Sequence, residues 1–373
     1  MERHRLLGMA LSFVPGMNAQ FVRHMEEAGV GLEEFFSSGQ QELAARLNIP
    51  ANPMLDRMVR DEALFKARKE SEFMERHGII SLSLTDGDYP SRLVDIEKAP
   101  VTLFKLGAAD LDAEKMLSIV GTRHATAYGT RYVASLVEDL APYFPDMVIV
   151  SGLALGIDSA AHEAALKAGL PTVAVVAHGL NTIYPSQNRD LAKRIIAAGG
   201  AIVSEYPSGV TPYRSRFLER NRIVATMTDA VLVAESADKG GAMSTAAVAS
   251  SFGRELLALP GRIGDEMSAG CNRLIRSQKA LMAGSAADMI SMLGWQPKNF
   301  PVAPRQRDLF PELEGAQKLI YDALRQAQQP MPVDALRDRT GLPIHDLMAS
   351  LGEMEFDGIV ERIPGNRFSL ISY

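Results

Sequence analysis

The stretch LSIVGTRHATAYG, residues 117–129, joins an apolar run to a polar turn and then to the start of a helical pattern. An apolar strand followed by a glycine-containing turn is typical of the central strands of an α/β sheet. A dinucleotide-binding loop would place further glycines at Arg123 and Thr126, where backbone approaches a pyrophosphate. The large cation at position 123 therefore raises the question of which anion this loop would meet.

The alternation of apolar runs and helical patterns continues from residue 115 to residue 290. Helical segments separate the runs, which we expect to be the strands MLSIVG, MVIVSG, TVAVVA, AIVSE, AVLVAE and ELLALPG. Strands of this kind form a mostly parallel sheet covered on both faces. The sequence predicts an α/β fold with an extended Rossmann-like doubly wound sheet, whose ligands bind at the carboxyl ends of the strands.

The flanking regions predict smaller domains. Residues 1–75 show helical spacing and are expected to form an N-terminal helical domain, of the SAM or helix-hairpin-helix kind. Its turn VPGMN, residues 14–18, lacks a second glycine that would admit a phosphate, so we interpret it as a packing turn. Residues 76–294 would hold the Rossmann-like sheet, the proline-rich residues 295–311 a linker, and residues 312–373 a winged helix of three helices and a hairpin.

Composition places limits on the class of protein. The 373 residues are 47% hydrophobic and carry a net charge of −6, so any phosphate site must be a local basic patch. A single cysteine, Cys271, excludes an internal disulfide and fits the reducing cytoplasm. The first residues, MERHRLLGMALSFVPG, imitate a signal peptide without its cleavage site, so secretion is not expected. No apolar run is long enough to cross a membrane.

The densest basic stretch is YRSRFLERNR, residues 213–222. It holds four arginines and one acid, Glu219, with Phe217 among them. An aromatic ring among arginines can stack bases while the cations hold phosphates. A solvated helix face with its phenylalanine in the core explains the pattern equally well, and the stretch alone does not decide between them.

Signals for catalysis or for a cofactor are missing from the sequence. The seven histidines show no metal-binding spacing, and neither a G-x-S-x-G elbow nor a Walker A lysine loop occurs. His162 has no nucleophile partner in the pattern, and we expect it to be a hydrogen-bonded helix residue. The sequence predicts no catalytic residue, no metal and no cofactor.

Seven motifs occur in an order that resembles one family. They are VGTR, SGLALGID, GLNTIYPSQN, FLERNRI, GGAMSTA, LPG and GCNRLI, and together they are similar to the DNA-processing protein A (DprA/Smf) family. The resemblance covers nearly the whole chain. It implies a homodimer without catalytic activity that binds single-stranded DNA. It also implies loading of the recombinase RecA onto incoming DNA in natural transformation and homologous recombination.

The resemblance also implies site residues. Arg123, Arg214 and Phe217 would hold the strand, and the neighbouring loops and the RNR segment would contribute Gly121, Ser151, Gly152, Gly156, Asn221, Arg222, Lys239, Gly240 and Ser244. An isolated phosphate that bulges past the first loop could be clamped by a bidentate guanidinium, which answers the question raised by Arg123.

Three departures from the family pattern are present. Leu218 replaces a common proline, GGAMSTA replaces S-G-S-L-I-T-A, and RSQKA replaces a G-A pair after LI. The last departure falls in NRLIRSQKALM, where we expect a dimer interface on an apolar stripe of Leu274, Ile275 and Leu281.

Two other functions compete with this one. A nucleoside-monophosphate hydrolase of the lysine-decarboxylase-like kind needs a PGGxGTxxE loop, but Ala247 and Val248 stand where its acid would be. A scaffold with a vestigial pocket is the third possibility. For the C-terminal tail, the acids Asp346, Glu353, Glu355 and Asp357 on its third helix predict a protein contact rather than duplex binding.

Overall fold

The structure is a computed structural model that describes residues 2–297, 313, 315–327, 329–356, 359–363 and 367–370. The chain divides into two compact units, residues 1–301 and 302–373. The helical N-terminal segment and the sheet belong to the first unit. Most of the expected linker, 295–311, lies outside the described residues, but Trp295 is buried and packs edge-on against Phe144 at 5.4 Å between ring centroids. Trp295 is therefore part of the core of the first unit.

The first unit contains a sheet in the order β1-β2-β6-β5-β4-β3-β7-β8-β9. The seven strands from β6 to β9 run parallel, and β1 and β2 add an antiparallel edge. The prediction of a mostly parallel sheet is confirmed. The strands are β1 (Ile79–Ser83), β2 (Thr102–Gly107), β3 (Met116–Gly121), β4 (Val148–Ser151), β5 (Thr172–Val176), β6 (Ala201–Ser204), β7 (Ala230–Glu235), β8 (Glu255–Ala258) and β9 (Leu281–Met282).

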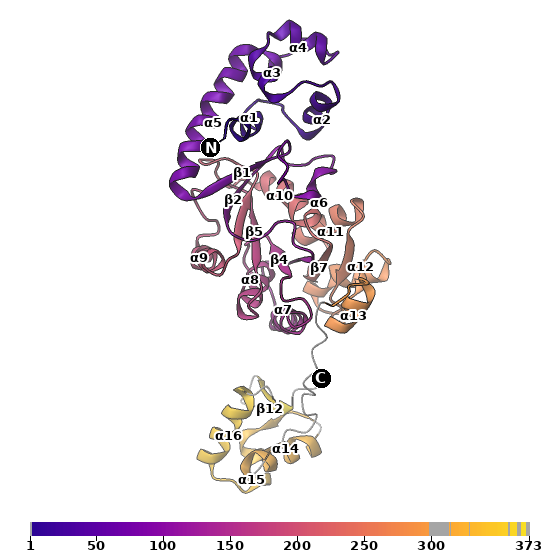
Figure 1. Ribbon diagram of the computed structural model, residues 1–373. Helices are drawn as coiled ribbons and strands as arrows, with labels where there is room; N and C mark the ends of the chain where they lie inside the picture. The colour runs from indigo at the N-terminus through magenta and orange to yellow at the C-terminus, as the bar shows by residue number, and fades with distance from the viewer. Residues whose placement is uncertain are drawn as a thin grey trace. The chain divides into compact units, whose positions relative to one another are not determined.

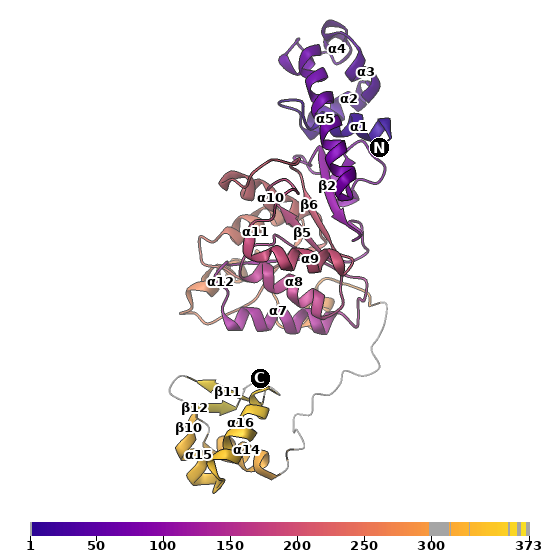
Figure 2. The same ribbon diagram turned by 90° about the vertical axis from the view of Figure 1, so that its left-hand side faces the viewer.

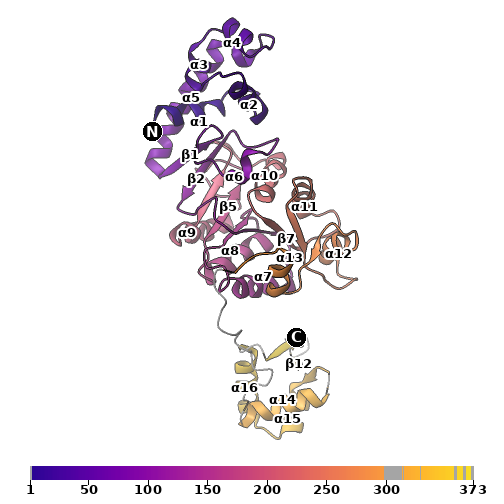
Figure 3. The same ribbon diagram turned by 45° about the vertical axis from the view of Figure 1, so that its right-hand side comes forward.

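Helices cover both faces of this sheet (Figure 1, Figure 2). One face packs against α7 (Ala127–Leu140), α8 (Ile157–Lys167), α9 (Arg189–Ala197) and α13 (Ala286–Met292). The other face packs against α10 (Arg214–Thr226), α11 (Gly241–Ser251) and α12 (Ala269–Arg276). Figure 3 shows α13 beside α7. Because both faces are covered, the strands carry no polar alternation, which is the pattern seen in the sequence.

Neighbouring residues of a strand enter different cores. In β3, Leu117 and Ile119 pack with α7 and α8, whereas Met116 and Val120 face the α10 and α11 side. This alternation is the period of two that a pleated strand imposes. The position of a residue along β3 therefore determines which of the two helical layers its side chain faces.

The N-terminal helices pack on the antiparallel edge of the sheet (Figure 1). Asn18 caps the second helix by accepting a hydrogen bond from Phe21 N at 3.0 Å, and Gly16 takes φ +85° in the turn before it. The helices are α1 (Arg3–Leu11), α2 (Ala19–Glu27), α3 (Leu32–Ser37), α4 (Gln40–Arg46) and α5 (Arg57–His77), and the short α6 (Ser91–Val94) follows β1. Val14 is buried in this turn, which joins two packed helices.

The second unit has its own apolar core. Its helices are α14 (Gly315–Ala327), α15 (Val333–Thr340) and α16 (Ile344–Phe356), and its three-stranded sheet has the order β10 (Met331–Pro332), β12 (Arg367–Leu370), β11 (Val360–Ile363). Three helices followed by an antiparallel β11–β12 hairpin form a winged helix, as predicted.

Candidate nucleic-acid interface

The motif-bearing loops meet because the strands that precede them are adjacent. The order β5-β4-β3-β7 places the segments that follow these four strands along one edge of the sheet. Ile157 N donates to Thr122 O at 3.1 Å, and Thr122 N donates to Glu235 O at 2.7 Å. The segments after β3, β4 and β7 are thus hydrogen-bonded into one surface, at the edge where α/β sheets bind their ligands.

Two residues named by the resemblance lie in contact at this edge. The Arg123 guanidinium carbon lies 5.6 Å from the centroid of the Phe217 ring, within the range of a cation–π contact. Arg123 comes from the loop after β3, and Phe217 comes from the first turn of α10. The Phe217 ring in turn lies beside that of Tyr184, with centroids 5.7 Å apart. A cation and two aromatic rings therefore share one surface patch, in which Arg123 and Tyr184 are exposed and Phe217 is partly buried.

Further cations of the patch are exposed. Among the described residues, the side chains of Arg214 and Lys239 make neither a hydrogen bond nor an ion pair. Arg216 is partly covered, because its guanidinium lies 5.6 Å from the Tyr206 ring centroid. Uncommitted cations at strand ends can bind anions without first losing an internal partner.

Arg220 has a different role from the one its sequence context suggests. Its side chain is buried, and its Nη1 donates to the carbonyl of Gly152 at 2.6 Å and also to the carbonyl of Val175. Burial lowers the pKa of Arg220, and the nearby carboxylate of Asp158 opposes that shift. Burial also raises the pKa of Asp158. Arg220 joins α10 to the ends of β4 and β5 and does not reach the exposed patch.

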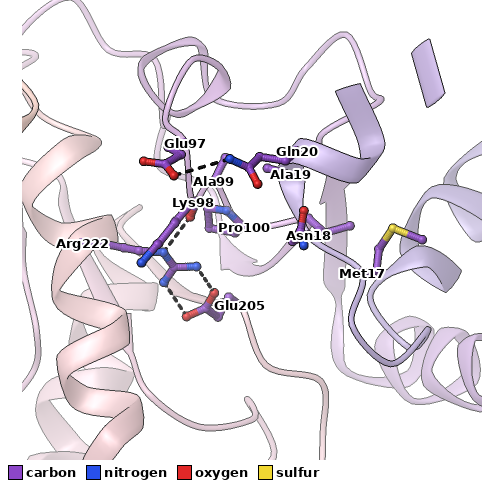
Figure 4. Close-up of a pocket in the computed structure, with 11 residues that line it drawn as sticks. Met17, Asn18, Ala19, Gln20, Glu97, Lys98, Ala99, Pro100, Glu205 and Arg222 are labelled. Carbon is purple, nitrogen blue, oxygen red and sulfur yellow. Dashed lines mark hydrogen bonds and ion pairs between the residues drawn. The ribbon is translucent and has the colours of Figure 1, made fainter. Parts of the chain in front are cut away.

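Arg222 is likewise committed inside the protein. Its guanidinium donates two hydrogen bonds to the Glu205 carboxylate, and its Nε donates to Lys98 O at 2.7 Å. These groups line a hollow of about 350 Å³ between α10 and the start of α2, shown in Figure 4. The expected strand contact at Arg222 is revised, because a guanidinium that is already paired with a carboxylate is not free for a phosphate. Glu205 could not be recognised as the partner of Arg222 from the sequence, because it lies 17 residues away, after β6.

Several loop residues that were expected to contact the strand instead hold the loops together inside the protein. Ser151 is fully buried and donates to Ile119 O at 2.6 Å, so its hydroxyl is not presented at the surface. Gly156 has φ +79°, and a Cβ there would lie 2.7 Å from the Arg123 carbonyl carbon. A Cβ on Gly121 would lie 2.7 Å from Ile157 Cβ. These positions need small residues because the loops pack closely on one another.

The N-termini of the helices at this edge differ in whether a side chain of the protein already occupies them. The start of α7 is occupied, because the buried Glu235 carboxylate accepts hydrogen bonds from Thr126 N, at 2.8 Å, and from Thr126 Oγ1. This carboxylate, placed at the positive end of the helix dipole, was missed from the sequence. The only signal for it was a polar residue at the end of a buried strand.

The start of α11 has no side-chain cap at Gly240. A Cβ on Gly240 would crowd Ser236, and Asn221 Nδ2 donates to Ser244 Oγ at 3.2 Å. The first turn of α11 is thereby held against α10, beside Lys239.

The residues expected at a dimer interface divide into two groups. Leu274 is buried in the core of the first unit, and Ile275 packs partly against that core. Leu281 and its neighbour Met282 are 39% and 54% exposed on β9, which pairs with β8 and has no second strand partner among the described residues. The exposed apolar surface is therefore narrower than the expected stripe and lies on an edge strand.

Within the described part of the chain, no group of three His, Cys, Asp or Glu side chains could hold a metal ion. None of the helices in these described residues is long and apolar enough to cross a membrane. His162 is buried, and its Nδ1 lies 2.7 Å from Thr172 Oγ1, which itself donates to Ile149 O. His162 Nδ1 is therefore the donor of that pair, as expected for a hydrogen-bonded helix residue.

The fold and this edge define a class: a Rossmann-like doubly wound protein with an exposed cationic and aromatic patch at its strand ends and an appended winged helix. The model of the family described as "DNA recombination-mediator protein A" matches residues 80–294, and that of the "DprA winged helix domain" matches residues 304–366. The chain belongs to the DNA recombination-mediator protein A family.

Curated and solved relatives support the same assignment. Protein Smf of Escherichia coli is 35% identical over 287 residues, which is 74% of each chain. The X-ray structure of DNA processing protein A from Streptococcus pneumoniae is 32% identical, with a TM-score of 0.64 over 76% of this chain and 95% of that one. The structure of DNA processing protein A from Helicobacter pylori, described for its single-stranded DNA binding mode, is 31% identical with a TM-score of 0.52. That match covers 58% of this chain and 95% of the other.

Proposed function

We propose that this protein binds single-stranded DNA without catalysing a reaction and acts as a recombination mediator. The observation that carries the proposal is the exposed Arg123 guanidinium held over the partly buried Phe217 ring of α10. A cation beside a ring suits a single strand, because phosphates and bases alternate along it and any base can stack on the ring. The single-stranded DNA binding described for the Helicobacter pylori relative supports the ligand class.

The strand site consists of Arg123, Arg214, Phe217 and Lys239, with the start of α11 at Gly240 and Ser244. Arg123, Arg214 and Lys239 supply the positive charge, and Phe217 supplies a stacking face. The glycines at 121 and 156 act by permitting the close loop packing that holds Arg123 in place, and Gly152 leaves room for the buried Arg220 side chain. Ser151 and Arg222 are left out of the site because their polar atoms are engaged inside the protein.

The biological step that we propose is the loading of RecA onto incoming single strands in natural transformation and homologous recombination. Its support is membership of a family described as recombination mediators. We also propose a homodimer through β9 and a cytoplasmic location, in keeping with the reduced, buried Cys271. Co-purification of the protein with RecA on single-stranded DNA tests the partner.

The hydrolase remains the competing function, and the site gives it little support. Ala247 and Val248 lie in α11, where that chemistry would need an acid. The nearby carboxylate of Glu235 is engaged by Thr126. Incubation with nucleoside monophosphates, followed by assay for released base, tests this function directly, and turnover would favour it over the mediator.

Fluorescence anisotropy with labelled oligo-dT over a salt series tests strand binding. We expect log affinity to fall with log salt at a slope of about −2, since three exposed cations each contribute about −0.7. Arg123→Ala and Arg214→Ala should each weaken binding by about 1–3 kcal/mol and flatten the slope. Phe217→Leu should weaken binding without changing the slope, since it removes no charge.

Arg68 on α5 provides the matched control, because it is exposed and lies outside the strand site. Arg68→Ala should bind oligo-dT as the wild type does. Equal or tighter binding of blunt duplex by the wild type would overturn the single-strand proposal.

A further inference from the structure

Tyr184, the second aromatic residue of the patch, has an exposed ring that packing alone does not explain. Tyr184 is 46% exposed, and its ring plane is tilted by 50° from that of Phe217. Among the described residues, no hydrogen bond to its hydroxyl is present. A ring that served only to pack would be covered, whereas about half of this one is open to solvent beside Phe217.

The backbone that carries Tyr184 is firmly held. Tyr184 N donates to His178 Nε2 at 3.2 Å, and His178 is fully buried. On the other side of the loop, Asn188 Nδ2 donates to Leu153 O at 2.8 Å and to Ser159 Oγ at 2.9 Å. A backbone fixed in advance reduces the conformational entropy lost when a ligand stacks on the side chain that it carries.

The separation of the two rings limits how a strand can lie on them. Their centroids are 5.7 Å apart, whereas successive bases in a duplex strand rise by about 3.4 Å. Two neighbouring bases that stack on tilted rings at this spacing cannot also stack on each other. A strand must therefore give up base–base stacking at this step, which costs most for adenine-rich strands and least for thymine-rich ones.

We propose that Tyr184 is a second base-stacking residue, and that the Phe217–Tyr184 pair makes the site prefer weakly self-stacked, pyrimidine-rich single strands. This inference rests on the proposed function, because it concerns the strand at that same site. It adds a specificity that a lone ring with surrounding cations would not supply.

The test compares full-length wild type with Tyr184→Leu and Tyr184→Phe, using oligo-dT and oligo-dA of equal length in anisotropy titrations. Wild type should bind oligo-dT at least about threefold more tightly than oligo-dA. Tyr184→Leu should weaken oligo-dT binding by about 5- to 100-fold and reduce the dT/dA ratio, with the salt slope unchanged. Tyr184→Phe should stay within about twofold of wild type, because it keeps the ring.

Two controls separate the possible failures. Phe65→Leu removes an exposed ring from α5 and should change neither affinity nor the dT/dA ratio. If wild type binds no single strand, the proposed function fails. If wild type binds and Phe217→Leu weakens it while Tyr184→Leu matches wild type, only the role of Tyr184 is overturned. A flattened salt slope in Tyr184→Leu would also overturn it, by showing a displaced cation instead of a lost ring.

Discussion

The guanidinium of Arg220 occupies the space that a β-carbon on Gly152 would need. Its Cζ lies 2.7 Å from the position of that carbon, and its Nη1 donates to the Gly152 carbonyl at 2.6 Å. The glycine of the second loop thus admits an internal arginine rather than a ligand. Arg220 in return ties α10, which carries Phe217, to the ends of β4 and β5.

Gly152→Ala should therefore destabilise the protein by about 1–3 kcal/mol, since the added methyl must displace a buried, hydrogen-bonded side chain. Urea or thermal unfolding measures the loss. Gly241→Ala is the control, because a Cβ at Gly241 meets nothing within 4 Å, and its stability should be unchanged or slightly higher. A Gly152→Ala protein as stable as wild type would show that Arg220 can move freely.

Arg222→Ala should lower stability by about 2–3 kcal/mol, because it leaves the Glu205 carboxylate largely buried without its partner. Denaturant unfolding measures this, and a double-mutant cycle with Glu205→Ala should show coupling. Arg214→Ala, which removes an exposed cation from the same helix, should change stability by less than about 0.5 kcal/mol. The revised role of Arg222 is wrong if its alanine variant keeps full stability and loses strand affinity.

The buried His162 should make stability depend on pH. Burial lowers the pKa of His162 to about 3, whereas an unfolded histidine titrates near 6.5. Between these values the unfolded state binds the extra proton, so stability falls as pH decreases below about 6.5, by about 2 kcal/mol at pH 5.

Unfolding measured from pH 7.5 to pH 5 should show this fall in wild type and a shallower one in His162→Asn. His124→Gln, which alters an exposed histidine, should keep the wild-type dependence. Parallel pH curves for wild type and His162→Asn would contradict the assignment.

The acidic third helix of the winged unit should oppose duplex binding. Asp346, Glu353 and Glu355 are exposed on α16. Reversing two of these charges in the full chain, Asp346→Lys with Glu353→Lys, should raise duplex affinity at low salt by at least about threefold and leave oligo-dT binding unchanged. Glu26→Lys with Glu27→Lys, on exposed positions of α2, is the matched control. Duplex binding by wild type that disappears in Arg362→Ala with Arg367→Ala would show that the wing carries the contact.

The exposed apolar pair on β9 should support a dimer. Light scattering at micromolar concentration should give about twice the 40.5 kDa chain mass for wild type. Leu281→Arg should give a monomer, because it places a charge on the open edge strand. Met58→Arg, which charges an exposed residue of α5, should remain a dimer. A monomeric wild type would contradict the proposed dimer.

The sequence by itself determined the sheet, the order of its elements and the winged helix. Runs such as MVIV, residues 147–150, and AVLVA, residues 230–234, are apolar at every position, which only a strand covered on both faces tolerates, and the turns after them marked the strand ends. It also placed Arg123 and Phe217 in one site, through motifs whose order resembles a family.

Only the tertiary structure decided which arginines of residues 214–222 are free. Along a helix, Arg214, Arg216, Arg220 and Arg222 look alike, but their partners come from distant segments: Gly152 and Val175 for Arg220, Glu205 and Lys98 for Arg222. An arginine is free to bind a ligand only if the fold brings no internal hydrogen-bond acceptor within reach of its guanidinium. Those acceptors lie in segments that are far apart in the chain. The same reason hid Glu235 at the start of α7 and Tyr184 beside Phe217.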